Sequence, residues 1–170
     1  MASAGRDERA WVRGAQRGSA ADLEALFDAH WQRAHRAAYL VVQDASLAED
    51  IAQEAFLAAI RNLDRFDRRR PFGPWLHRIV VNRAIDAART RSLRREAELT
   101  ESFADPTEPA TVDRSVLAAL ASLPPEQRAV VVMRHLLGYT PGQIARALDL
   151  PRGTVNSRLR RGLDAMREEL

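Results

Sequence analysis

The sequence has no cysteine, and because lysine is also absent its 26 basic residues are all arginine. The lack of cysteine excludes disulfides, thiol nucleophiles and cysteine-ligated zinc. The only histidines that could bind a metal are His30, His35, His77 and His135. None of them lies beside a pair of acidic residues at the spacing of a metal site. We therefore expect no metal, no cofactor and no enzymatic activity.

Long apolar runs are absent as well, and the N-terminal stretch carries acidic residues early. This pattern is not typical of a signal peptide or a membrane span, so the expected location is cytoplasmic. The 26 basic and 23 acidic residues give a net charge of only +3. The distribution of charge along the chain, rather than its total, must therefore indicate any anionic partner.

Strand signals are scarce, whereas apolar residues recur at helical spacing over long stretches. The expected fold class is all-α, with two small helical domains joined by a flexible acidic linker. We expect a first domain over 1–92, with helices over about 7–17, 20–43, 46–62 and 73–92. Ser46 and Glu49 form the expected capping box of the third helix. The second helix should bury one apolar face: Leu23, Leu26, Phe27, His30, Trp31, Ala34, Ala38 and Val41.

The segment 93–112 is the expected linker, because it contains Pro106 and Pro109 and sets two arginines against five acids. The flanking segments each carry a net charge of +3, with fifteen arginines against twelve acids before the linker and nine against six after it. Two modestly basic domains are therefore predicted on either side of an acidic tether.

The expected second domain, 113–170, has the punctuation of a helix-turn-helix. Asp113 can cap a short helix, Pro124 and Pro125 can begin another, and Gly138 can end it in the left-handed conformation. Thr140 and Pro141 then begin a helix that ends in a turn over 149–151. Gly153 should allow close approach of the last helix, whose inward stripe is Val155, Leu159, Leu163 and Met166.

The opposite face of that last helix is polar and basic, with no acid before Asp164. Long cationic side chains suit phosphates, and the planar donors of arginine and asparagine suit base edges in the major groove. The alternative is an ordinary solvated face, which an arginine-rich helix can also be. Together with the turn chemistry, the pattern favours DNA binding by Arg152, Thr154, Asn156, Ser157, Arg158, Arg160 and Arg161.

The run GTVNSRLRRGLDAMR, with the residues from Leu123 that precede it, resembles the fourth conserved region of extracytoplasmic-function (ECF) sigma factors. The resemblance implies that this last helix reads the minus-thirty-five promoter element, and that the polymerase contact of the domain is the flap of the second-largest subunit. One departure is that Gly142 and Gln143 stand where the family usually has acidic residues.

The third helix of the first domain has a core stripe and an opposite polar face that includes one leucine. The expected core stripe is Ile51, Ala52, Ala55, Phe56, Ala59 and Ile60. An exposed leucine among acids and an amide suits a partner surface, although a solvent face with an incidental leucine fits the periodicity equally well. The candidate partner-binding residues are Asp50, Gln53, Glu54 and Leu57, with Arg61 beside them.

The order and spacing of AEDIAQEAF and LDRFDRRRPFGPWLHRIVVNRAIDAAR resemble the second conserved region of the same sigma factors. The resemblance implies that Asp50, Gln53 and Glu54 dock on the clamp helices of the largest subunit of core RNA polymerase. It also implies that the next loop and helix open the minus-ten promoter element, and that an anti-sigma factor regulates the protein. An unpaired strand needs a cationic track and a place for a flipped base, which these residues could supply: Phe66, Asp67, Arg68, Arg69, Arg70, Trp75, Arg78, Asn82 and Arg83.

Two residues of this helix allow more than one interpretation. Trp75 could be a stacking platform, but with Leu76 and Ile79 beside it the core is favoured. His77 is interpreted as a surface residue. A basic patch further along the helix is expected to touch phosphates through Arg89, Arg91, Arg94 and Arg95. An autonomous repressor stays an alternative to the sigma factor.

Overall fold

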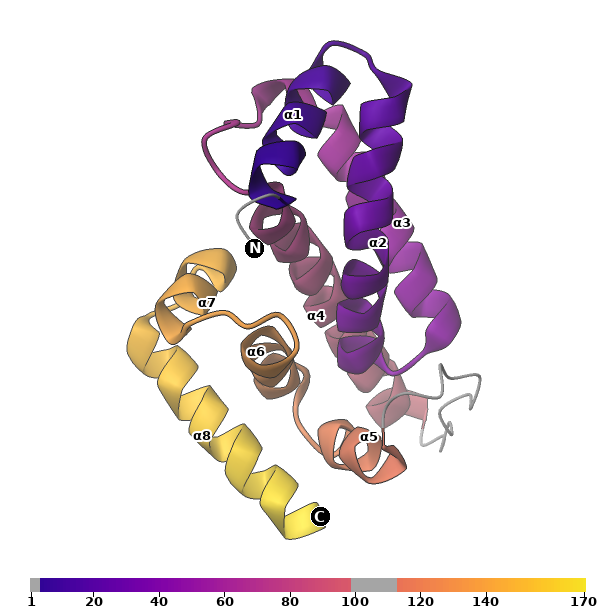
Figure 1. Cartoon of the computed structure of the whole chain (residues 1–170). Helices are drawn as coiled ribbons and strands as arrows, with labels where there is room; N and C mark the ends of the chain where they lie inside the picture. The colour runs from indigo at the N-terminus through magenta and orange to yellow at the C-terminus, as the bar shows by residue number, and fades with distance from the viewer. Residues whose placement is uncertain (1–3, 99–112) are drawn as a thin grey trace.

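The computed structural model describes residues 4–98 and 113–170, and it is helical throughout these ranges apart from turns and loops (Figure 1). This confirms the all-α expectation. The first half contains α1 (Ala4–Gln16), α2 (Ala20–Val42), α3 (Ala45–Arg61), a short 3-10 turn (Leu63–Arg65) and α4 (Phe72–Glu98). The second half contains α5 (Arg114–Ala121), α6 (Pro125–His135), α7 (Pro141–Leu148) and α8 (Arg152–Glu169). Most of the predicted linker, residues 99–112, lies outside the described residues.

The start of α3 differs from the prediction. Asp44, not Ser46, is the N-cap, and its carboxylate accepts a hydrogen bond of 2.9 Å from the backbone N–H of Leu47. The predicted capping box of Ser46 and Glu49 is therefore wrong. Asp44 also accepts a hydrogen bond of 2.6 Å from Arg91 of α4, so this cap fixes one helix to another. The bond from the Leu47 N–H lowers the pKa of Asp44, and the Arg91 contact acts in the same direction.

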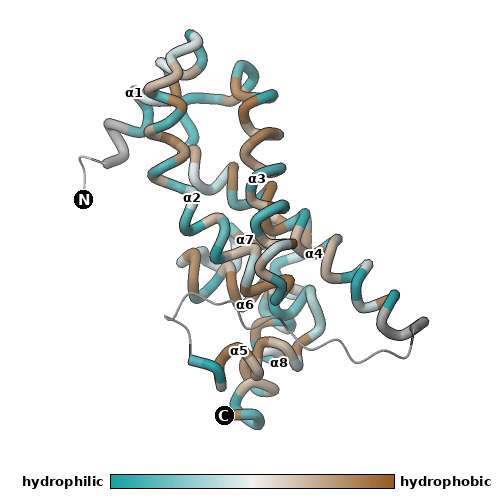
Figure 2. Tube along the Cα trace, turned by 90° about the vertical axis from the view of Figure 1, so that its right-hand side faces the viewer, coloured by the Kyte–Doolittle hydropathy of each residue, from teal (hydrophilic) through white to brown (hydrophobic). Residues whose placement is uncertain are grey.

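Helix α4 continues beyond its predicted end at about residue 92, into the predicted linker. No glycine or proline interrupts the sequence between Trp75 and Glu98, so no local signal ends the helix. Its last turns leave the core: Leu93 is 67% exposed. In the side view of Figure 2, this end of α4 extends beyond the other helices.

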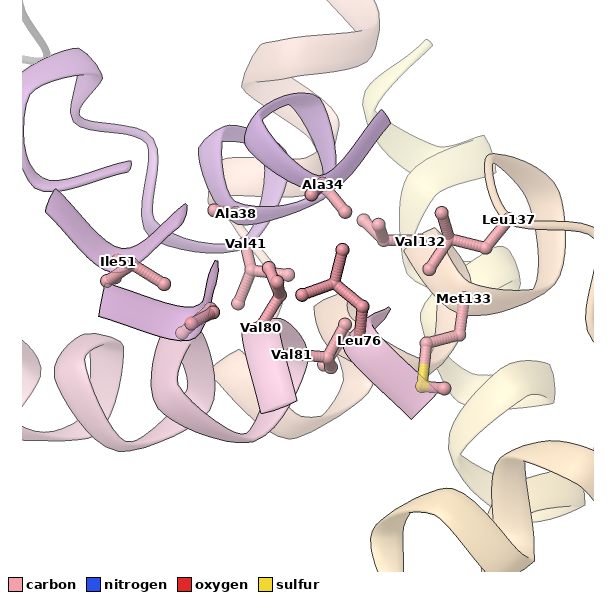
Figure 3. Close-up of a cluster of buried hydrophobic side chains, with 14 of the residues drawn as sticks. Ala34, Ala38, Val41, Ile51, Leu76, Val80, Val81, Val132, Met133 and Leu137 are labelled. Atoms are coloured by element: carbon pink, nitrogen blue, oxygen red, sulfur yellow. The ribbon is translucent and has the colours of Figure 1, made fainter. Parts of the chain in front are cut away.

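The core of the first half forms where α2 lies between α1, α3 and α4. Small residues of α2, Ala34, Ala37 and Ala38, are fully buried and allow close helix packing. Figure 3 shows Ala34, Ala38 and Val41 of α2 facing Leu76, Val80 and Val81 of α4, with Ile51 of α3 beside them. The predicted stripe of α2 is buried in its second half, at Ala34, Ala38 and Val41. In its first half only Leu26 is buried, whereas Phe27 is 39% exposed and the others are half-buried: Leu23, His30 and Trp31.

The caps of the second half confirm the predicted punctuation. Asp113 caps α5, Pro125 begins α6, and Gly138 adopts a positive φ of 75°. Thr140 caps α7 in a full capping box with Gln143, one of the two residues at which the sequence departs from the resembling family. Asp149 ends α7 in the left-handed region, with φ 53°.

The close approach of α8 occurs at a different glycine from the one predicted. A Cβ on Gly153 would meet nothing within 4 Å, whereas a Cβ on Gly162 would lie 3.0 Å from Val131 Cγ2. Of the predicted inward stripe, Val155 is fully buried, and Leu159, Leu163 and Met166 are half-buried. The backbone of α8 therefore approaches α6 at Gly162, between these side chains.

The two halves of the described chain pack directly on each other. Helix α6 lies against α2 and α4, and Val132, Met133 and Leu137 meet Leu76 and Ala34 (Figure 3). The buried guanidinium of Arg128 donates 2.7 Å to Val41 O in the first half, and 3.0 Å and 2.8 Å to Ala121 O and Leu123 O in the second. We call the surface where α2 and α4 meet α6 and α7 the interdomain interface.

Candidate functional site

The predicted DNA-reading face of α8 is turned outward. Helix α8 packs against α5, α6 and α7, and Figure 1 shows it on the far side of these helices from α1–α4. Four of the seven predicted residues are exposed: Arg152, Asn156, Arg160 and Arg161. The other three are half-buried: Thr154, Ser157 and Arg158.

Local bonds explain why part of this face is held in place. The Ser157 hydroxyl donates to Thr154 O at 2.9 Å, which orients that hydroxyl along the helix instead of outward. The turn before α8 is fixed by the left-handed Asp149 and by the Leu150 N–H, which donates to Ala145 O at 2.9 Å. In the described part of the chain, Arg152, Arg160 and Arg161 form no ion pair. Their charges face solvent and suit a polyanion.

The predicted partner surface on α3 also lies on one exposed face. Asp50, Gln53, Glu54 and Leu57 are all exposed, and Leu57 has 50% of its surface accessible. Gln53 donates 3.2 Å to Glu49 on the same face. Five residues of the predicted core stripe are buried, but Ile60 is 41% exposed, so its assignment to the core is wrong.

Ile60 instead borders an apolar hollow of about 300 Å³ between α2 and α3. The partly exposed Phe27 lines the same hollow, and its ring stacks on Trp31 at a centroid distance of 4.9 Å. Helical periodicity assigned Ile60 and Phe27 to the core. Periodicity identifies the apolar face of a helix, but it does not show along which part of that face a neighbouring helix packs.

The predicted minus-ten residues do not share one surface. Arg68, Arg69 and Arg70 are exposed on the loop, where Asp67 accepts hydrogen bonds from the backbone N–H and side chain of Arg69. The Arg69 side-chain bond holds the pKa of Asp67 below its usual range. Phe66 is only 8% exposed, so the ring supports the loop from beneath.

Trp75 combines both interpretations, because it is half-buried and packs one side on Phe66 at a centroid distance of 4.6 Å. Its ring also borders two hollows, one beside the loop and one at the interdomain interface. Arg78 is exposed, whereas Asn82 is half-buried and donates 3.5 Å to Ala147 O of α7. The structure therefore places Asn82 at the interdomain interface.

One ion pair, which the sequence did not suggest, joins the two predicted surfaces of the first half. Arg83 of the minus-ten set donates 2.8 Å to Glu54 of the partner surface. Both side chains are substantially exposed, at 41% and 63%. The helix positions of these residues were predictable, but the packing angle of α3 on α4 that brings them together was not.

The interpretation of His77 as a surface residue is wrong. It is 5% exposed, and its Nδ1 lies 2.7 Å from the Tyr139 hydroxyl across the interdomain interface. Burial lowers the pKa of His77 to about 4 and raises the pKa of Tyr139 to about 12. Both groups are therefore uncharged near neutral pH.

The basic patch at the end of α4 is partly committed to internal contacts. Arg89 pairs with Glu126 of α6, and Arg91 pairs with Asp44. Arg94 is exposed, and the side chain of Arg95 lies outside the described residues. Of this patch, Arg94 is the described side chain that is both exposed and without an internal ion pair.

Comparison with known proteins identifies two conserved regions in this arrangement. The family model described as Sigma-70 region 2 matches residues 26–94, and the model described as Sigma-70, region 4 matches residues 113–166. The ECF RNA polymerase sigma factor SigL of Mycobacterium tuberculosis is 35% identical over 164 residues, covering 92% of this chain and 93% of SigL. SigW of Bacillus subtilis is 30% identical over 162 residues, covering 85% of this chain and 87% of SigW. The chain belongs to the ECF RNA polymerase sigma factors.

Solved structures agree with this assignment. CnrH in complex with the cytosolic domain of CnrY has a TM-score of 0.72 and 26% identity, with 95% of this chain and 96% of that one covered. The sigma factor RpoE of Bartonella quintana, solved with the anti-sigma factor NepR, has a TM-score of 0.74 at 20% identity and covers 87% of this chain and 96% of its own. The second similarity concerns the fold alone.

In this ECF sigma factor, region 2 therefore comprises most of α2, with α3 and much of α4, and region 4 comprises α5 to α8 without the last residues. The outward basic face belongs to region 4, and the exposed face of α3 belongs to region 2. Among the described helices, none is both long enough and apolar enough to cross a membrane.

Proposed function

We propose that this ECF sigma factor binds core RNA polymerase through the α3 face of Asp50, Gln53, Glu54 and Leu57, and directs it to promoters through two DNA-reading surfaces. The observation that carries the proposal is the outward face of α8, where Arg152, Asn156, Arg160 and Arg161 are exposed together. The α3 face would dock on the clamp helices of the largest subunit, and region 4 would contact the flap of the second-largest subunit.

In region 2, the exposed loop arginines Arg68, Arg69 and Arg70 would follow the phosphates of the unpaired minus-ten strand. The partly exposed ring of Trp75 would border the place of a flipped base. Asn82 would need α7 to move away before its amide could reach a base, because it now donates to Ala147 O. The proposed domains are 1–92 and 113–170. The segment that joins them would set the distance between the two promoter elements that the protein reads.

The promoter-reading assignment predicts different outcomes for two neighbouring residues of α8. Asn156→Ala should relax the choice of base at one position of the minus-thirty-five element, at a cost of about 1–3 kcal/mol on the preferred sequence. Arg160→Ala should lower affinity for all sequences and reduce the salt slope of binding by about one. Fluorescence anisotropy of reconstituted holoenzyme on promoter variants at several salt concentrations measures both effects.

Arg114→Ala is the control, because Arg114 is an exposed arginine of region 4 outside the α8 face. Uniform weakening by both α8 variants, with no change in base preference, would contradict the assignment of roles. The same assay separates a sigma factor from an autonomous repressor, which would bind promoter DNA tightly without core polymerase.

The proposed role is that of a non-enzymatic, cytoplasmic initiation factor, held inactive by an anti-sigma factor. The similarity to CnrH, which was solved with the cytosolic domain of CnrY bound, supports a protein partner of this kind. Purification of the native protein followed by mass spectrometry tests it: recovery of polymerase subunits with one additional regulator is the expected result.

A further inference from the structure

A basic hollow lies at the interdomain interface and receives residues from both regions of the sigma factor. Its volume is about 480 Å³, within the range of small-molecule sites. Region 2 contributes Arg70, Trp75 and Arg78 to its lining, and region 4 contributes Tyr139, Gln143 and Arg146. The hollow is therefore complete only while α7 lies against α4.

The charge of this hollow is not neutralised internally. None of the residues that line it is acidic. In the described ranges, Arg70, Arg78 and Arg146 form no ion pair, unlike Arg83, Arg89 and Arg91 of α4. Asp67 lies near Arg70 on the loop, but its carboxylate is bonded to Arg69. Three unpaired guanidinium groups around one hollow favour a ligand with several negative charges.

Flat aromatic surfaces accompany these charges. Trp75 is held by Phe66 on one side and borders the hollow, and the Tyr139 ring is fixed because its hydroxyl is bonded to His77. Pro71 and Pro74 also line the hollow. Aromatic rings beside arginines suit a ligand that combines a flat ring with phosphates.

Gln143 adds directional hydrogen-bond donors. Its Oε1 accepts from the Thr140 N–H at 2.8 Å and from the Thr140 hydroxyl at 3.0 Å. The capping box thereby fixes the amide, and the two N–H donors of the amide remain for the hollow.

We propose that this hollow binds a free nucleoside polyphosphate, with the base against Trp75 and Tyr139 and the phosphates among Arg70, Arg78 and Arg146. Because both regions supply ligand contacts, the nucleotide stabilises the arrangement in which region 4 lies on region 2. The hollow shares Arg70, Trp75 and Arg78 with the proposed minus-ten set, so the free nucleotide and the promoter strand would compete for these side chains.

Isothermal titration of the full chain with ATP and with GTP tests the proposal. The expected result is saturable binding that Arg146→Ala weakens at least about tenfold, or 1.4 kcal/mol. Arg114→Ala, an exposed arginine outside the hollow, should change the affinity less than about twofold. Inorganic triphosphate should bind more weakly than ATP, because it lacks the ring. Equal affinity of the wild-type chain and Arg146→Ala for ATP would overturn the proposal.

Thermal unfolding provides a second measurement and shows that the variants fold. ATP should raise the midpoint of the wild-type chain and of Arg114→Ala, but not that of Arg146→Ala. Titration with a short single-stranded oligonucleotide distinguishes a site for free nucleotides from a site for the promoter strand. If the oligonucleotide binds and neither ATP nor GTP does, the hollow is part of the promoter-strand surface and the proposal is wrong.

Discussion

His77 occupies a position at the interdomain interface where its neighbours affect both its burial and its charge. Burial is the main reason that its pKa falls to about 4, and the electrostatic influences of His30 and Arg33 act in the same direction. Glu8 opposes the shift but is the weakest of these influences. The neutral imidazole forms a hydrogen bond with the Tyr139 hydroxyl. Because burial disfavours the charged imidazolium, the neutral form is the one that fits the folded protein.

This shift predicts a specific pH dependence of stability. The unfolded chain binds a proton at His77 near pH 6.5, whereas the folded chain does so only near pH 4. The contribution of His77 is therefore complete above about pH 6.5 and is lost as the pH falls toward 4, by up to about 1.4 kcal/mol per pH unit. Urea unfolding of the wild-type chain and His77→Gln at several pH values should show the smaller pH slope for the variant.

Tyr139→Phe is the control, because it removes the hydroxyl and leaves the imidazole buried. This variant should keep most of the wild-type slope. If His77→Gln has the same slope as the wild-type chain, another group causes the pH dependence.

At the scale of the helices, the two glycines of α8 have opposite structural roles. Gly162 is buried against Val131 and Leu123 of the neighbouring segment, whereas Gly153 faces open space in the first turn. The sequence places both on the same helix, but only the crossing of α8 over α6 distinguishes them.

We expect Gly153→Ala to stabilise the protein by about 0.5–1 kcal/mol, because alanine restricts the unfolded chain and adds no clash. Gly162→Leu should destabilise it by about 1–3 kcal/mol, because the side chain would overpack the contact with Val131. Free energies of unfolding from urea titrations measure both changes. Equal effects at the two positions would show that α8 does not approach α6 at Gly162.

The elements themselves were largely predictable, since caps and apolar spacing are local. Thr140, Pro141 and Asp113 mark helix starts in the sequence, and the structure confirms them. Ile60 and His77 were misassigned because their burial depends on which helix lies next to them, and a single helical period carries no such information. Phe66 was expected beside a flipped base, and its burial beneath the loop was not predicted for the same reason.

On the scale of the whole molecule, the apolar core is continuous across the interdomain interface. Buried side chains from α2, α4 and α6 belong to one cluster. The sequence indicated two domains and a tether, and it gave no sign that they pack together. The reason is that Arg128, Gln43 and Tyr139 make their interdomain bonds over sequence separations of 62 to 87 residues.

This continuity predicts one cooperative unfolding transition for the isolated chain. The three tryptophans, Trp11, Trp31 and Trp75, all lie in the first half, and Trp75 also borders the interdomain interface, so their fluorescence reports on that half and on its contact with region 4. Far-ultraviolet circular dichroism reports helices in both halves. The two signals should change at the same urea concentration in the wild-type chain, and separate midpoints would show that the halves unfold independently.

The ion pair between Arg83 and Glu54 has a thermodynamic consequence. A partner that takes the Glu54 carboxylate releases the Arg83 guanidinium, and a phosphate that takes Arg83 releases Glu54. Each binding event thus removes a competitor of the other, and linkage requires the mutual enhancement to be equal in both directions. Because exposed ion pairs contribute about 0.2–1 kcal/mol, this enhancement amounts to a few-fold at most. Under the proposed assignment of Glu54 to polymerase and Arg83 to the promoter strand, these two would be cooperative ligands of region 2 through a single shared contact.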